Sequence, residues 1–159
     1  MLGLDGSGKT AILYRVKTGE LVGTSTTVGF NLEYFAVRGL NVCVWDIGYK
    51  GCVRPLWRHY LVNTQALIYV VDCSDSDRIE QSSRELQELL SKESLKSAVL
   101  LVYANKQDVE GAAGPQELER ILQLNPGTGK VWKVQGCSAK TGSGVQEGFD
   151  WLCEQLTTA

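Results

Sequence analysis

Hydrophobic and polar positions along the chain follow two periodicities in turn, which predicts strands that alternate with helices. Helical spacing of apolar residues is found over residues 9–17, 83–90, 115–124 and 145–156. Strand-like stretches cover residues 31–37, 40–45, 66–71, 98–104 and 131–137. Two of these stretches, residues 66–71 and 98–104, are continuously apolar, which is typical of strands buried on both faces of a parallel sheet. The pattern predicts an α/β domain with a mainly parallel central sheet flanked by helices.

Short connections between the predicted elements refine this picture. Arg38 and Gly39 join two strand-like stretches, which predicts a β-hairpin there. Gly19 is placed to end the first helix, and Pro115 fits the first turn of a later one. Because ligands of open α/β sheets bind beyond the carboxyl ends of the strands, we expect the functional groups in the loops that follow the strands.

Length, composition and charge exclude several classes of protein. A chain of 159 residues fits one domain covering residues 1–159. A net charge of −2 argues against a protein held to nucleic acid or anionic lipid by bulk charge. The longest apolar stretches fall far short of the ~20 residues that span a bilayer. Since the five cysteines are scattered, without a CxxC pair, we expect reduced thiols in a cytoplasmic protein.

A phosphate-binding motif stands near the start of the chain. Residues 3–10 (GLDGSGKT) match the pattern GxxxxGK(S/T), directly before a predicted helix. Its glycines let the backbone wrap around phosphate oxygens, with N–H groups facing the anion. Lys9 then neutralises the β- and γ-phosphates, and the Thr10 hydroxyl coordinates Mg²⁺. A Gly-rich turn without a ligand is the weaker alternative. The predicted contacts are Asp5, Gly6, Ser7, Gly8, Lys9 and Thr10.

A second motif, residues 105–108 (NKQD), follows a buried strand and indicates recognition of guanine. The Asp108 carboxylate can accept the N1–H and exocyclic N–H of guanine, a donor pair that adenine lacks. The Lys106 stem can cover the base plane, and Asn105 can hydrogen-bond within the loop or to the base. Alone, these four residues fit a surface loop equally well. The loop after the last strand adds backbone N–H groups for the guanine O6, those of Ser138, Ala139 and Lys140.

Candidate metal-binding residues lie around the predicted hairpin. Asp46 ends a strand, and a carboxylate at a strand end near a phosphate loop can hold Mg²⁺ through water. The alternative is a solvated carboxylate at a strand end. Thr27 is a candidate for the remaining Mg²⁺ position, although spacing alone does not distinguish it from Thr24, Ser25 and Thr26.

Taken together, these motifs resemble the Arf and Arf-like family of small GTPases, over essentially the whole chain. The matching stretches are residues 3–10, 27–31 (TVGFN), 45–48 (WDIG), 54–60 (RPLWRHY), 63–66 (NTQA), 104–108 (ANKQD) and 148–152 (GFDWL). The resemblance implies a P-loop NTPase fold with an interswitch β-hairpin, GTP or GDP as bound nucleotide, and Mg²⁺. It also implies effector proteins, exchange factors and activating proteins as partners, in vesicle and membrane traffic.

The same resemblance assigns further roles to individual residues. It selects Thr27 for Mg²⁺ and places Gly48 at the nucleotide, in the second switch. It marks three aromatic residues as the effector-binding set, although the residues alone favour core packing for two of them. These three are Phe30, Trp45 and Tyr60.

The second switch departs from the family pattern at two positions. Tyr49 and Lys50 stand where the family has Gly and a water-orienting Gln. An ammonium has three donors and no acceptor, so Lys50 occupies the catalytic position without the usual chemistry. Lys50 can instead place a positive charge near the γ-phosphate. Tyr49 is strained by ~1–3 kcal/mol if the backbone at its position adopts a sparsely populated φ/ψ region. A hydrolysing switch, a hydrolysis-deficient GTP-binding scaffold and a mobile loop that tolerates both residues therefore stay open.

The start of the chain is the second departure. Only Met1 and Leu2 precede Gly3, so we expect this chain to lack the family's N-terminal amphipathic helix and most of the first strand. Membrane association is then expected of a longer N-terminal form, on the Golgi or other endomembranes. A P-loop kinase is disfavoured by residues 105–108, and a non-functional fragment is the remaining alternative.

Overall fold

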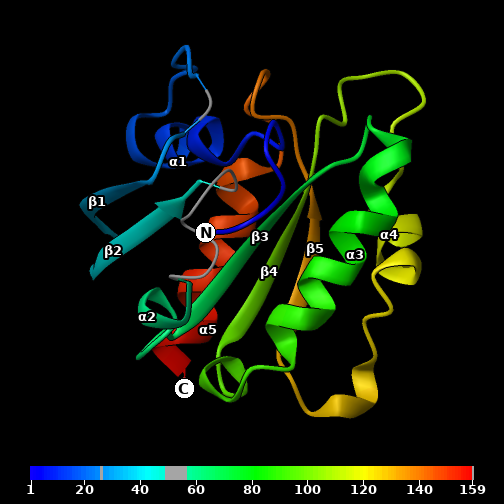
Figure 1. Cartoon of the computed structure of the whole chain (residues 1–159). Helices are drawn as coiled ribbons and strands as arrows, with labels where there is room; N and C mark the ends of the chain where they lie inside the picture. The colour runs from blue at the N-terminus through cyan, green and yellow to red at the C-terminus, as the bar shows by residue number, and fades with distance from the viewer. Residues whose placement is uncertain (26, 49–56, 159) are drawn as a thin grey trace.

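The computed structural model describes residues 1–25, 27–48 and 57–158 and contains two sheets (Figure 1). Strands β1 (Phe30–Val37) and β2 (Leu40–Ile47) form an antiparallel hairpin. The other sheet is parallel, in the order β3-β4-β5, with bounds Ala66–Asp72, Val99–Asn105 and Trp132–Gly136. The α-helices are α1 (Lys9–Thr18), α2 (Trp57–Tyr60), α3 (Ser76–Leu90), α4 (Pro115–Ile121) and α5 (Val145–Thr158). Two 3₁₀ helices, η2 (Glu93–Leu95) and η3 (Pro126–Thr128), complete the described elements.

Two hydrophobic clusters cover the two faces of the parallel sheet, and β4 is buried along its whole length. Alternate β4 residues point to opposite faces, with Leu100 in one cluster and Leu101 in the other. The first cluster includes Leu86 of α3 and Leu118 of α4. The second includes Phe149 of α5 together with residues of α1. This burial on both faces explains the continuous apolar stretches of β3 and β4, and it confirms the predicted α/β class.

Residues 1–2 lie between β2 and β3 and connect the two sheets (Figure 1). The Leu2 N–H donates to the Ile68 carbonyl at 2.8 Å, and the Leu2 carbonyl accepts from the Val70 N–H at 2.9 Å. On the other side, the Ile47 N–H donates to the Met1 carbonyl at 3.3 Å. The chain therefore enters the phosphate loop from a position between β2 and the middle of β3.

Several predicted elements are confirmed, with changes at their ends. The hairpin turns at Arg38 and Gly39, both with positive φ, as the sequence predicts. Gly19 ends α1 in the left-handed conformation, with its N–H bonded to the Arg15 carbonyl. Helix α3 begins at Ser76, well before the predicted start at residue 83, because its first turns are largely polar and hide the helical period. Helices α2, η2 and η3 were not predicted, since short helices carry little periodicity.

Neither a membrane-spanning helix nor a disulfide is found in the described part of the chain. Its helices are too short or too polar to cross a bilayer. Cys43 is an exposed free thiol, and the other described cysteines, Cys73, Cys137 and Cys153, are buried free thiols. Burial raises the pKa of the Cys73 thiol to about 12, so this side chain packs as a small, protonated hydrophobic group.

Candidate functional site

The loop between residue 2 and α1 holds its curved shape through glycine. Gly3 and Gly8 both have positive φ, at 149° and 97°. A Cβ atom at Gly3 would collide with the Val70 carbonyl oxygen of β3, and one at Gly8 would collide with the Asn105 side chain. The loop can therefore approach both β3 and the loop after β4 only because these positions carry no side chain.

Lys9 crosses this loop from the first turn of α1. Its ammonium donates to the carbonyl oxygens of Gly3 and Leu4, both at 3.0 Å. Burial lowers the pKa of Lys9, while the nearby Asp46 and Asp5 carboxylates act in the opposite direction. Lys9 also lines a cavity of about 200 Å³, together with Asp5, Gly6, Gly8, Thr10, Thr24, Ser25, Thr27 and Gly48. The cavity thus has the size and the cationic wall that a phosphate group requires.

Three oxygen-bearing side chains from separate segments meet beside this cavity: Thr10 and Thr27 line it, and the buried Asp46 contacts Thr10. The Thr10 hydroxyl lies 2.5 Å from Asp46 Oδ2, to which it donates, and 2.9 Å from the Thr27 hydroxyl. Asp46 is fully buried, and its Oδ1 has no hydrogen-bond partner among the described residues. A buried carboxylate oxygen without a donor, beside two hydroxyls, fits a hard divalent cation such as Mg²⁺. Thr27 contacts Thr10 in this arrangement, whereas Thr24 and Ser25 only line the cavity.

The segment before β1 packs against the end of β2 at the same cavity. The Gly48 N–H donates to the Gly29 carbonyl at 2.8 Å. A Cβ atom at Gly48 would collide with the Thr27 carbonyl oxygen. Gly48 therefore lets the two segments that carry Thr27 and Asp46 come together, which is why the sequence needs glycine at this position.

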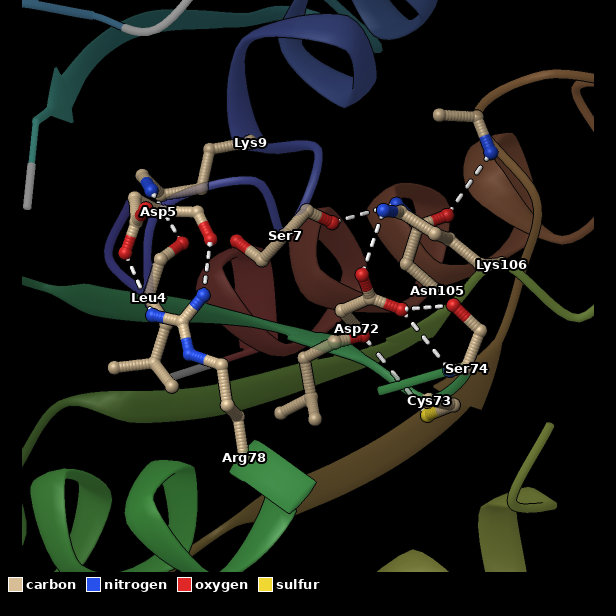
Figure 2. A network of polar contacts seen from close by, with 12 residues as sticks. Leu4, Asp5, Ser7, Lys9, Asp72, Cys73, Ser74, Arg78, Asn105 and Lys106 are labelled. Atoms are coloured by element: carbon tan, nitrogen blue, oxygen red, sulfur yellow. Dashed lines mark hydrogen bonds and ion pairs between the residues drawn. The ribbon is translucent and has the colours of Figure 1, made fainter. Parts of the chain in front are cut away.

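Asn105 joins the phosphate loop to the loops after β4 and β5 (Figure 2). Its side-chain Nδ2 donates to the Ser7 carbonyl at 2.8 Å, and its Oδ1 accepts from the Ala139 N–H at 3.0 Å. The side chain is buried. Asn105 was predicted to hydrogen-bond either within the loop or to the base, and the structure shows bonds between the loops. The Ala139 N–H was predicted to bind the guanine O6, but it donates to Asn105 instead.

Asp108 is exposed and held in place by the neighbouring loop. The Ser138 hydroxyl donates to Asp108 Oδ1 at 2.6 Å, and this bond lowers the pKa of the Asp108 carboxyl. Arg15 of α1 fixes the same loop by donating to the Ala139 carbonyl at 2.8 Å and to the Lys140 carbonyl at 2.5 Å. The candidate base-binding groups are therefore an ionised carboxylate beside a loop anchored from α1.

Two charged residues of the site, Asp72 and Arg78, were missed by the sequence analysis (Figure 2). Asp72 Oδ2 at the end of β3 lies 2.6 Å from the Lys106 ammonium. Arg78 in the first turn of α3 pairs with Asp5 of the phosphate loop at 2.6 Å. The position of Asp72 at a strand end was an available signal. Nothing in the sequence pairs Arg78 with a residue 73 positions away.

The three predicted effector-binding aromatics form one contiguous cluster. Ring centroids lie 5.3 Å apart for Phe30 and Trp45, 5.8 Å for Phe30 and Tyr60, and 5.3 Å for Trp45 and Tyr60. Trp45 and Tyr60 pack partly against the core, while Phe30 is 47% exposed. Core packing and an accessible aromatic surface thus coexist here. Tyr49 and Lys50, and the stretch from 54 to 56 of the motif 54–60, lie outside the described residues.

A phosphate loop before α1, a polar loop after β4 and a parallel sheet with helices on both faces define the P-loop small GTPase fold. The profile of the ADP-ribosylation factor family matches residues 1–156, so the chain belongs to this family. Among solved structures, the Arl6 BBS3 small GTPase from Trypanosoma brucei with bound nucleotide analogue GppNp is similar, with a TM-score of 0.90. The two sequences are 36% identical, and the match covers 99% of this chain and 95% of that one. The resemblance and the fold class are confirmed.

Proposed function

We propose that this protein is a guanine-nucleotide switch that binds GTP or GDP with Mg²⁺ and recruits effector proteins in intracellular membrane traffic. The observation that carries the proposal is the contact of Thr10 with Thr27 and with Asp46, beside the cavity that Lys9, Thr10 and Thr27 line. Thr10 lies in α1, Thr27 lies in the loop before β1, and Asp46 lies in β2. A ligand that engages all three connects segments that are separate in sequence, which is the basis of an order–disorder switch.

Thr10 and Thr27 would hold the magnesium through their hydroxyls. Asp46 would hold it through a bound water or through Oδ1, which has no hydrogen-bond partner among the described residues. When bound, Mg²⁺ neutralises charge on the phosphate oxygens. The Lys9 ammonium lies at the same wall and offsets the remaining negative charge. The Gly48 N–H is bonded to the Gly29 carbonyl, which keeps the segments that carry Thr27 and Asp46 in contact.

Guanine is the base that the loops after β4 and β5 favour. The Asp108 carboxylate accepts the two guanine N–H donors, and its lowered pKa keeps it ionised for that role. The Lys106 stem covers the base plane while its ammonium pairs with Asp72. In the loop after β5, the Ala139 N–H bonds to Asn105. The next backbone donor, the Lys140 N–H, is then the one that binds the guanine O6. Effectors then engage the cluster of Phe30, Trp45 and Tyr60.

A second candidate is a switch that binds GTP and hydrolyses it poorly. Tyr49 and Lys50 favour it, since Lys50 cannot accept a hydrogen bond from the attacking water. The scaffold would then stay in the GTP-bound state and hold its effector for longer. Both candidates share the nucleotide site and differ only in turnover.

Nucleotide binding is tested by titrating the protein with fluorescent GTP, GDP and ATP analogues, with Mg²⁺ or with EDTA. We expect tight binding of both guanine nucleotides, no measurable ATP binding and weaker guanine binding in EDTA. Equal affinity for ATP and GTP, or no binding of either, contradicts the proposal. The Asp108→Asn variant serves as control, because it should lose guanine preference while keeping the response to EDTA.

Turnover is tested by single-turnover GTP hydrolysis of the wild-type chain and of the Tyr49→Gly/Lys50→Gln double variant. Poor hydrolysis predicts that the double variant is at least ~100-fold faster, the scale of contribution that one positioned group makes. A wild-type rate that the double variant leaves unchanged rejects the scaffold candidate. The nucleotide that co-purifies with each chain gives an independent readout, with GTP expected for the wild-type chain and GDP for the double variant.

A further inference from the structure

An ion pair connects the start of α3 to the phosphate loop, and neither partner belongs to the metal-binding set. Arg78 Nη2 lies 2.6 Å from Asp5 Oδ1, and Nη1 donates to the Asp5 backbone carbonyl at 3.3 Å. Figure 2 shows the guanidinium reaching from the helix toward the loop, with Lys9 on the far side of Asp5. The side chains of Arg78 and Asp5 are 35% and 25% exposed, and Asp5 is the partner that lines the cavity.

Helix stability does not explain the place of this arginine. Residues in the first turn of a helix feel the positive end of its macrodipole, which disfavours a cation there. Arg78 occupies that turn of α3, directly after Asp77. Its fork of N–H donors instead satisfies two oxygens of Asp5, one on the side chain and one on the backbone.

Asp5 is an unusual residue for the wall of a phosphate site. It lines the cavity with Lys9 and Thr10, where a carboxylate repels a phosphate. Burial has the largest effect on the pKa of Lys9 and lowers it. Both partners of the pair also act on this pKa: the Asp5 carboxylate raises it and the Arg78 guanidinium lowers it. The charges of Asp5, Arg78 and Lys9 are therefore coupled within one small region.

We infer that Arg78 is a positioning residue that neutralises Asp5 and thereby sets the preference of the site for GTP over GDP. The inference rests on the proposed function. GTP carries about one more negative charge than GDP, so the Asp5 carboxylate repels GTP more strongly than GDP unless its charge is offset. By holding the Asp5 backbone carbonyl as well, Arg78 also fixes the curvature of the loop that receives the phosphates.

The test measures the dissociation constants of fluorescent GppNp and GDP in Mg²⁺ buffer for a set of charge variants. For Arg78→Gln we expect about tenfold weaker GppNp binding and clearly less loss for GDP, the size of coupling that contacting residues show. In the Asp5→Asn background the same substitution should change GppNp binding by less than about twofold. Arg78→Lys should keep the GppNp preference but bind both nucleotides more weakly, because a lysine cannot reach two oxygens at once.

The Arg84→Gln variant is the matched control, since it removes the same charge from an exposed position of the same helix. Equal losses for GppNp and GDP in Arg78→Gln, or an unchanged loss in the Asp5→Asn background, overturn the inference. So does a loss of the same size in Arg84→Gln. If Arg78→Gln fails to fold, as judged by its melt without nucleotide, the Asp5→Asn/Arg78→Gln double variant decides. It should bind GppNp within about twofold of Asp5→Asn, and a larger loss in the double variant overturns the inference. Failure of the proposed function appears separately, as a wild-type chain that binds neither nucleotide.

Discussion

The two ends of the candidate nucleotide site are built in different ways. At the base end, the Asn105 side chain uses both its donor and its acceptor within the protein, and Ser138 holds Asp108. At the phosphate end, Asp46 Oδ1 and Ser7 Oγ are buried without a hydrogen-bond partner among the described residues. The groups named at the base end are hydrogen-bonded within the protein, whereas the phosphate end keeps two buried polar groups that no other described residue satisfies.

This difference indicates where nucleotide binding changes the protein. An unsatisfied buried polar group costs about 1–3 kcal/mol, which a ligand recovers when it supplies the missing partner. The base end has little of this free energy to recover, so it can serve as a fixed anchor. The phosphate end joins Thr10, Thr27 and Asp46 from separate segments, so binding there can alter how those segments lie.

The largest effect is expected from removing the link between the two ends. Asn105→Ala leaves the Ser7 carbonyl and the Ala139 N–H buried without their present partner, which should cost about 2–4 kcal/mol. The melting temperature should fall by roughly 5–15 °C, measured by circular dichroism without nucleotide. Asn125→Ala is the matched control, because Asn125 forms a similar bond in an exposed turn. A melt of Asn105→Ala like that of the control would mean that the base end is not preformed.

A change of opposite sign is expected at the phosphate end. Asp46→Asn keeps the acceptor for Thr10 but removes the charge of a buried carboxylate. In EDTA and without nucleotide, its melting temperature should equal or exceed that of the wild-type chain. With Mg²⁺ and GTP, it should lose the metal-dependent part of the stabilisation, about 1–3 kcal/mol.

Thermal melts with and without Mg²⁺ check this second expectation. If Asp46→Asn keeps the full Mg²⁺-dependent rise in melting temperature, the metal does not use this carboxylate. If it melts well below the wild-type chain in EDTA, the unpartnered oxygen is not a source of recoverable free energy. Either result would remove the contrast between the two ends.

The smallest effect comes from a matched pair of serine substitutions. Ser138→Ala loses the bond to Asp108 and the one accepted from the Thr141 N–H, and should destabilise the protein by about 1 kcal/mol. Ser7→Ala removes a buried hydroxyl that has no hydrogen-bond partner in the described part of the chain, and it should leave stability unchanged or slightly raise it.

Chemical denaturation of both serine variants without nucleotide gives the comparison. Ser138→Ala should also let the pKa of Asp108 return toward its usual value. The pKa of Asp108 is lowered in the folded protein, so guanine binding is lost only as the pH falls through that lowered value. In Ser138→Ala this loss should begin at a higher pH. Equal effects of the two serine substitutions on stability would show that the polar groups at the two ends do not differ in how well they are hydrogen-bonded.

The sequence by itself determined the elements that depend on local periodicity and local backbone conformation. The hairpin turn at Arg38 and Gly39, the end of α1 at Gly19 and the buried strands β3 and β4 were all predicted, because each is encoded in neighbouring residues. The motif residues 3–10 and 105–108 were found for the same reason. The assignments of Tyr49 and Lys50 stay predictions, since both lie outside the described residues.

Tertiary structure decided which of these residues meet. It brought Thr27 to Thr10, turned the Ala139 N–H toward Asn105, and paired Arg78 with Asp5 and Lys106 with Asp72. Each of these contacts joins segments far apart in the chain, and its geometry depends on how the sheet places the ends of its strands. Periodicity specifies a residue's own element and the face it buries, but the partner of a charged side chain follows only from the packed path of the whole chain.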